Sequence, residues 1–194
     1  MKKAVFAVLI LMMVGSCSSG YKGSPRNLDN ACLLLQERKQ YAKAFRRAER
    51  RHHVPTHVLM AMIHQESKFN GDARTPHRYA LGIIPMGRQS SAYGYSQALD
   101  GTWDEYKTET GNRRAKRNDM NDATDFMGWY MNKTKQRLGI PLSDTYNQYL
   151  AYHDGHTGYA RGTYRKKAWL MNVATKVSQR SVLYQGQLAR CRYR

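Results

Sequence analysis

Apolar residues recur every three to four positions through most of the chain after residue 30, a spacing typical of amphipathic helices. The pattern predicts helices over about residues 30–53, 55–69, 101–109, 119–138, 144–152 and 164–188. Pro55 suits a first helical turn, and Gly71 favours the end of the same helix. No segment alternates apolar and polar residues as a half-buried strand does. The predicted fold class is therefore mainly α, in a single domain.

Residues 70–92 lack helical spacing and are broken by several Pro and Gly residues. We expect them to form a long irregular loop, and loops of this length in compact domains are often functional. The basic segment 113–118 is expected to be a solvated turn.

The N-terminus has the pattern of a secretory leader. A short basic start precedes an apolar run over residues 4–14, which is too short to span a bilayer. The run ends in Val14-Gly15-Ser16-Cys17, which resembles the lipobox of bacterial lipoproteins. We therefore expect a signal peptide over residues 1–16, a lipid on Cys17 and a flexible tether over residues 17–29. An ordinary cleaved signal followed by a chance cysteine is the alternative.

Charge narrows the choice of partners. The 194 residues contain 32 Lys and Arg against 14 Asp and Glu, a formal net charge of +18. Such a charge is common in nucleic-acid-binding proteins, but an exported protein meets cell-wall polymers and lipid headgroups instead. We expect an anionic glycan or a membrane surface as partner and no nucleic acid.

The remaining cysteines form an even pair. If Cys17 carries a lipid, Cys32 and Cys191 are left in an oxidising compartment, where a disulfide between them is expected. Two unpaired buried thiols are the alternative.

One acidic residue lies where an apolar one is expected. At helical spacing, Leu59, Ile63 and Glu66 fall on one stripe of the predicted helix 55–69. Burial favours the protonated form of a carboxyl group, and a protonated carboxyl near neutral pH can act as a general acid. The alternative is a glutamate that bends to solvent or pairs with a nearby cation, and the periodicity does not decide between the two.

Three short motifs extend this observation. Glu66-Ser67 follows an apolar helix, the segment 92–97 reads Ala-Tyr-Gly-Tyr-Ser-Gln, and the segment 151–155 reads Ala-Tyr-His-Asp-Gly. In this order, and with Thr102-Trp103 between the second and third, they resemble the lytic transglycosylases with a soluble-lytic-transglycosylase (SLT) domain. The resemblance covers about residues 52–175, within a folded domain expected over residues 30–194.

The resemblance implies a goose-lysozyme-like helical domain that cleaves the β-1,4 bond between N-acetylmuramic acid and N-acetylglucosamine in peptidoglycan. It implies that Glu66 is the general acid and then the base that closes a 1,6-anhydro ring, assisted by the substrate's own N-acetyl group. Ser67 would orient the Glu66 carboxyl. The residues implied to bind substrate are Ser67, Tyr95, Gln97, Tyr152 and His153, with Tyr95 contributing through the backbone near it.

The sequence also departs from that family. His153 stands where the family has Asn, and Trp169 stands about where it often has Tyr. Asp154 offers a second carboxylate beside the third motif, so hydrolysis is an alternative, although a turn aspartate beside Gly155 is the simpler interpretation. The rival function is a non-catalytic peptidoglycan-binding component of an envelope-spanning machine.

Further expectations concern cofactors and location. His64-Gln65-Glu66 lacks the second histidine of a zinc protease motif, and His153 and His156 have only loose ligand spacing, so we expect no metal and no cofactor. Ser18 after the lipidated cysteine fits sorting to an outer membrane facing the periplasm. A secretion or conjugation apparatus is the expected kind of partner machinery.

Overall fold

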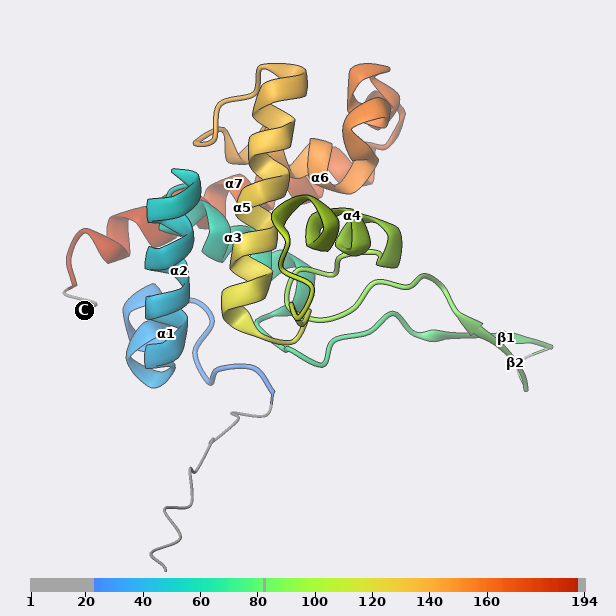
Figure 1. Cartoon of the computed structure of the whole chain (residues 1–194), viewed down its shortest axis with the longest axis horizontal. Helices are drawn as coiled ribbons and strands as arrows, with labels where there is room; N and C mark the ends of the chain where they lie inside the picture. Colours follow the sequence, from blue (N-terminus) through green and yellow to red (C-terminus); the bar gives the residue numbers. More distant parts are fainter. Residues whose placement is uncertain (1–22, 82, 192–194) are drawn as a thin grey trace, which may run out of the picture.

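The computed structural model describes residues 23–81 and 83–191, and Figure 1 shows a mainly α-helical architecture. The mainly α expectation is confirmed. The predicted signal peptide and the predicted lipid-bearing Cys17 lie outside the described residues. Within the described residues, no helix combines the length and the apolar character that a membrane span requires.

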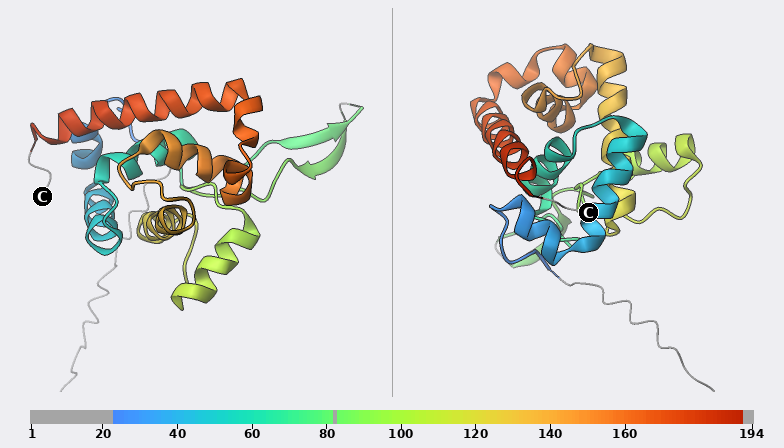
Figure 2. Two further views of the ribbon diagram at one scale, coloured as in Figure 1. Left: turned by 90° about the horizontal axis from the view of Figure 1, so that it is seen from above. Right: turned by 90° about the vertical axis from the view of Figure 1, so that its left-hand side faces the viewer.

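In chain order the helical elements are α1 (Ala31–Glu37), α2 (Lys39–His52), α3 (Thr56–Ser67), α4 (Asp100–Thr110), α5 (Met120–Leu138), α6 (Thr145–Ala160), the 3-10 helix η1 (Thr163–Lys166) and α7 (Ala168–Leu188). Helix α3 is central, because it contacts α2, α5, α6 and α7. Helix α2 packs on α5, α3 on α7, and α6 on both α5 and α7 (Figures 1 and 2).

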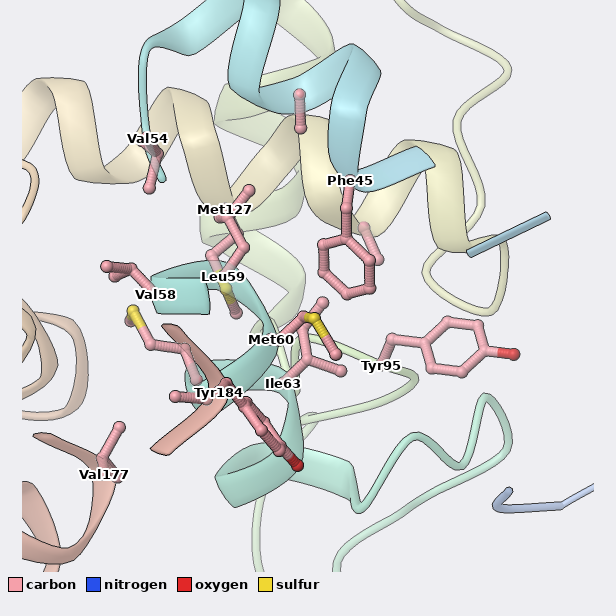
Figure 3. Packing of buried hydrophobic residues seen from close by; sticks show 14 of the residues in the cluster. Phe45, Val54, Val58, Leu59, Met60, Ile63, Tyr95, Met127, Val177 and Tyr184 are labelled. Atoms are coloured by element: carbon pink, nitrogen blue, oxygen red, sulfur yellow. The ribbon is translucent and has the colours of Figure 1, made fainter. Parts of the chain in front are cut away.

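Helix α3 forms the centre of the core. Leu59, Met60 and Ile63 are 0 % exposed, and Figure 3 shows them packed against Phe45 of α2 and Tyr184 of α7. A second, aromatic cluster joins α4 to α5 and consists of Ala98, Trp103, Tyr106, Phe126 and Trp129. Both clusters lie between residues 31 and 184, so a chain that begins at residue 18 keeps the whole described core.

Three predicted helices differ in detail from the structure. The helix expected over residues 30–53 is divided into α1 and α2, because Arg38 adopts φ −118° and ψ 70° between them. The helix expected over residues 164–188 begins as η1 and continues as α7. The helix predicted to end at about residue 152 continues to Ala160, past a kink at Gly155.

The expectation of a strandless loop over residues 70–92 is wrong. Strands β1 (His77–Ala80) and β2 (Ile84–Arg88) pair antiparallel in this segment and project from the helical body (Figure 1 and the left view of Figure 2). The strands escape prediction because they do not cover a core. Alternation of apolar and polar residues arises where one face of a strand is buried, and most side chains of these strands are exposed.

The ends of the domain are fastened to each other. A disulfide joins Cys32 of α1 to Cys191 beyond α7, which confirms the expected pairing. The tether expected over residues 17–29 needs a correction for its last part, because the Tyr184 hydroxyl donates to the Leu28 carbonyl and Arg180 pairs with Asp29 at 2.8 Å. These contacts hold residues 28 and 29 against α7.

Candidate active site

Glu66 lies in the last turn of α3. The helix ends where Lys68 adopts a left-handed conformation, with φ 53°, and the next residue, Phe69, is again left-handed and 0 % exposed. Burial of Phe69 draws the chain back into the core directly after the helix. The Glu66 side chain is thereby kept at the protein interior, although the residue as a whole retains some exposed surface.

The Glu66 carboxyl lies in surroundings that favour its protonated form. Its Oε1 atom is buried and has no hydrogen-bond partner among the described residues. Burial raises the pKa of Glu66 from the ordinary 4.5 to about 7, while a hydrogen bond with Tyr149 and the charge of Lys68 act in the opposite direction. The desolvation cost exceeds both favourable interactions, so a large fraction of this carboxyl is protonated at neutral pH.

Two tyrosines of α6 face this carboxyl. Tyr149 is 3 % exposed, and burial together with the Glu66 charge raises its pKa. The pKa of Tyr152 is also raised, first by burial and then by the Glu66 charge, and its hydroxyl donates to the Ser96 carbonyl at 2.6 Å. The third sequence motif is thus brought next to the first, and Tyr152 links both to the second.

The segment 94–97 has a backbone that only certain residues permit. Gly94 has φ 79°, and a Cβ atom there would lie 2.1 Å from the Arg117 carbonyl oxygen, so a side chain is excluded. Gln97 has φ 50°, and its amide nitrogen donates to the carbonyls of Ala73 at 3.0 Å and Gly94 at 2.8 Å. These contacts fix the loop whose Ser96 carbonyl meets Tyr152.

The side chains of Ser67 and Tyr95, two residues expected at the site, are engaged in contacts within the fold, and the expected contribution of the backbone near Tyr95 stays a prediction. The Ser67 hydroxyl donates to the Ile63 carbonyl at 3.3 Å, one turn back in its own helix, and no contact with the Glu66 carboxyl is found in the described part of the chain. The Tyr95 ring lies in the core (Figure 3), where its hydroxyl is 2.8 Å from the Tyr41 hydroxyl, and its backbone N–H donates to Arg117. Tyr95 therefore stabilises the fold under the loop.

The other expected binding residues meet around a cavity. Gln97, Tyr152 and His153 line a hollow of about 270 Å³ between α4, α5 and α6. The full lining consists of Gln97, Ala98, Leu99, Thr102, Phe126, Tyr130, Tyr152, His153, Asp154 and Gly155. Glu66 does not line this cavity. Tyr152 does line it, and the negative charge of Glu66 contributes to the raised pKa of Tyr152.

Asp154 is engaged in structural contacts beside the kink of α6. Gly155 breaks the helix with φ 74° and ψ 157°. One carboxylate oxygen of Asp154 pairs with Lys167 and the other accepts a hydrogen bond from Thr163. Burial raises the pKa of Asp154, but these two partners outweigh it and hold the pKa below its usual range. Both oxygens are occupied, which favours the turn interpretation over a base or nucleophile.

His153 and Trp169, the two departures from the resembled family, touch each other. Their rings meet edge to face with centroids 5.1 Å apart, and both residues are exposed, Trp169 at 55 %. Partial desolvation and the charge of Lys167 lower the pKa of His153, so its imidazole is mostly neutral at neutral pH. A neutral ring that donates and accepts can replace part of the hydrogen bonding of an amide.

Sequence reasoning missed two site residues. Tyr149 precedes Tyr152 by three positions, so helical spacing already places both on one face of α6. Tyr130 of α5 lines the cavity and packs on Tyr152 with ring centroids 5.1 Å apart. No group of three or more possible metal ligands gathers within residues 23–81 and 83–191.

Comparison with known proteins supplies the family. A family model described as "Transglycosylase SLT domain" matches residues 5–191, nearly the whole chain. None of the curated proteins compared with the chain matches it. The helical architecture and this match together confirm the SLT-type, lysozyme-like expectation.

Proposed function

Because this chain belongs to the family of transglycosylase SLT domains, we propose that it is a peptidoglycan lytic transglycosylase with Glu66 as its catalytic acid and base. The bond cleaved is the β-1,4 linkage between N-acetylmuramic acid and N-acetylglucosamine. The product carries a 1,6-anhydro-N-acetylmuramic acid end.

The state of Glu66 carries the proposal. Its buried Oε1 atom has no hydrogen-bond partner among the described residues, and burial raises the pKa of the carboxyl to about 7. A buried polar atom without a partner is costly, and proteins rarely retain one without a use for it. A carboxylic acid with this pKa is suited to give a proton and to take one back at neutral pH.

The proposed reaction needs one carboxyl. The protonated Glu66 gives its proton to the glycosidic oxygen, the bond from that oxygen to the anomeric carbon breaks, and N-acetylglucosamine leaves as an alcohol. The substrate's N-acetyl oxygen stabilises the positive anomeric carbon. The Glu66 carboxylate then removes the proton of the 6-hydroxyl, whose oxygen attacks the anomeric carbon and closes the anhydro ring. The enzyme ends in its starting protonation state.

The cavity beside Glu66 is the proposed sugar site. Gln97, Tyr152 and His153 offer polar groups, and Tyr130 and Phe126 offer aromatic surface, a combination suited to a sugar ring. Tyr152 lies between the sugar site and the acid in this assignment. Its hydroxyl is held by the Ser96 carbonyl, so its ring has a fixed position against the substrate.

A second candidate function rests on the same cavity. Glu66 does not line the cavity, and His153 stands where the family has Asn. Both features are compatible with a cavity that binds glycan without cleaving it. The protein would then attach an envelope-spanning machine, such as a secretion or conjugation apparatus, to the wall.

Digestion of purified sacculi separates these functions. Residues 18–194 are incubated with sacculi, and the released fragments are analysed by mass spectrometry. We expect anhydro-muropeptides from the wild type and a loss of at least about a hundredfold in Glu66→Gln, the scale of a lost general acid. Asp154→Asn, checked for folding, is the control for hydrolysis and should keep anhydro products.

Three other outcomes are informative. Reducing-end products that disappear in Asp154→Asn would assign hydrolysis instead. Absence of products from folded wild type, with sedimentation of both wild type and Glu66→Gln on sacculi, would assign the binding function. Equal product release by wild type and Glu66→Gln would remove Glu66 from the mechanism.

We also propose a location for this activity. A lipid on Cys17 and the following Ser18 would hold the domain at the periplasmic face of an outer membrane, within reach of peptidoglycan. Metabolic labelling with a fatty acid, compared between the full chain and Cys17→Ser, tests this anchor. Labelling of both chains, or of neither, would contradict it.

A further inference from the structure

The tip of the β-hairpin exposes a cluster of large apolar side chains. Leu81 is 90 % exposed, Ile83 80 % and Met86 63 %, and Tyr79 and Ile84 are at least half exposed. These five residues lie within eight positions of one another, in the part of the molecule that projects furthest from the helical body in Figure 1. Clustered exposure of this kind marks an interaction surface rather than ordinary surface scatter.

The apolar side chains point to both faces of the hairpin. Ala80 pairs with Ile84, so these two side chains share a face, and Tyr79, one position earlier, points to the opposite one. Yet Tyr79 is 56 % exposed and Ile84 is 50 % exposed. A protein partner usually covers one face of a two-stranded ribbon. Apolar groups on both faces suit a medium that surrounds the tip.

The charge near the hairpin has one sign. Between Asp72 and Asp100 the sequence contains no Asp or Glu, whereas Arg74, Arg78 and Arg88 lie within it. Arg88 donates to the Thr75 carbonyl at 2.6 Å, which places its cationic group at the base of the hairpin. An apolar tip above a cationic base matches an anionic lipid surface, where headgroups meet the cations and acyl chains meet the tip.

We infer that the hairpin formed by β1 and β2 inserts its exposed apolar side chains, those of Tyr79, Leu81, Ile83, Ile84 and Met86, into the surface of an anionic phospholipid bilayer, with Arg78 and Arg88 against the headgroups. The main-chain pairing of β1 with β2 satisfies part of the backbone within the hairpin, which makes a shallow position in the bilayer interface feasible. This contact is independent of the lipid proposed on Cys17 and of glycan cleavage. It would fix the orientation of the domain on the membrane.

Flotation with vesicles tests the inference on residues 18–194, which lack Cys17. One vesicle contains phosphatidylcholine alone, and the other contains phosphatidylcholine with phosphatidylglycerol at seven to three. We expect the wild type to float with the anionic vesicles, and Leu81→Ser/Ile83→Ser to reduce its partition coefficient at least about tenfold. Arg78→Gln is expected to reduce it severalfold on the anionic vesicles.

The matched control removes exposed apolar side chains elsewhere. Leu33→Ser/Val182→Ser changes residues that are 48 % and 65 % exposed on α1 and α7, and should bind like the wild type. Thermal unfolding of each variant confirms that it is folded.

Several results would overturn the inference. The first is that the folded wild type does not float with anionic vesicles. The second is that Leu81→Ser/Ile83→Ser floats as well as the wild type. The third is that the control Leu33→Ser/Val182→Ser loses as much vesicle binding as Leu81→Ser/Ile83→Ser. Self-association that Leu81→Ser/Ile83→Ser abolishes, without flotation of the wild type, would assign the tip to a second copy of the chain.

Discussion

Helix α3 and the β-hairpin place side chains of similar apolar character in opposite surroundings. In α3, Leu59 and Ile63 are 0 % exposed, whereas Leu81 and Ile83 of the hairpin region are 90 % and 80 % exposed. In each region the residue of interest is in the less favourable medium: the Glu66 carboxyl in an apolar interior, and isoleucine and leucine in water. Burial of the carboxyl costs free energy of folding, and the exposed hairpin side chains forgo the free energy that burial would supply, so each arrangement indicates a function that packing alone does not explain.

The largest expected effect contrasts the same residue type in the two regions. Ile63→Ala should lower the free energy of unfolding by about 2–5 kcal/mol, because it leaves a cavity in the main core. Ile83→Ala should change it by no more than about 0.5 kcal/mol, because the side chain is already hydrated. Urea unfolding of the two variants measures both. A comparable loss in Ile83→Ala would mean that the hairpin packs on the body in solution.

A smaller effect is the pH dependence of the free energy of unfolding, which tests whether burial raises the pKa of the Glu66 carboxyl. The folded pKa of Glu66 is about 7, above the ordinary 4.5, so between these values the folded state holds a proton that the unfolded state releases. Below about pH 4.5 Glu66 is protonated in both states, and the folded state has its full stability with respect to this group. That part of the stability is lost as the pH rises through about 7. Glu66→Gln should therefore gain stability relative to the wild type, by about 3 kcal/mol at pH 8.

Thermal or urea unfolding at pH 4.5, 6 and 8 measures the difference in stability between Glu66→Gln and the wild type. The matched control is Glu109→Gln, which removes an exposed carboxylate whose pKa is lowered by its pairing with Lys133. Its difference from the wild type should not grow with pH above 6. A difference between Glu66→Gln and wild type that stays constant from pH 4.5 to 8 would contradict the raised pKa.

The smallest effect concerns a buried polar pair that is satisfied. The Tyr41 and Tyr95 hydroxyls are 2.8 Å apart in the core, unlike the Glu66 Oε1 atom, which has no partner in the described residues. Tyr41→Phe should cost about 1–3 kcal/mol because it leaves the Tyr95 hydroxyl buried alone. Adding Tyr95→Phe should cost less than the sum of the single changes, in a double-mutant cycle read by urea unfolding. Strict additivity would mean that the two hydroxyls do not interact.

The sequence predicted those parts of the fold whose pattern arises from burial. Helices α2 and α7 have an apolar stripe because one face of each contacts the core, and α3 is apolar over a continuous run because residues 58–64 are all buried. Both patterns are visible without a structure. The break at Arg38 was not predicted, because both α1 and α2 continue the same stripe and only the backbone angles separate them. The hairpin was not predicted because no core lies beneath it.

The sequence predicted which segments form the candidate site, but it did not predict where all of their side chains point. Gln97, Tyr152 and His153 come together around one cavity, as the motifs implied. The Ser67 hydroxyl was expected at the Glu66 carboxyl but turns to its own helix, and the Tyr95 ring, of which the sequence predicted only the neighbouring backbone at the site, turns to the core. Such directions depend on contacts with distant segments, such as Tyr41, that local sequence does not encode.

The most direct test of the account is the titration of the Glu66 carboxyl itself. In residues 18–194 with carboxyl-labelled ¹³C-glutamate, the Glu66 signal is the one missing from Glu66→Gln. The account predicts that its chemical shift titrates with a midpoint near pH 7, because burial raises the pKa to about 7. A midpoint near the ordinary value of 4.5 would show a solvated carboxylate and contradict Glu66 as a buried acid.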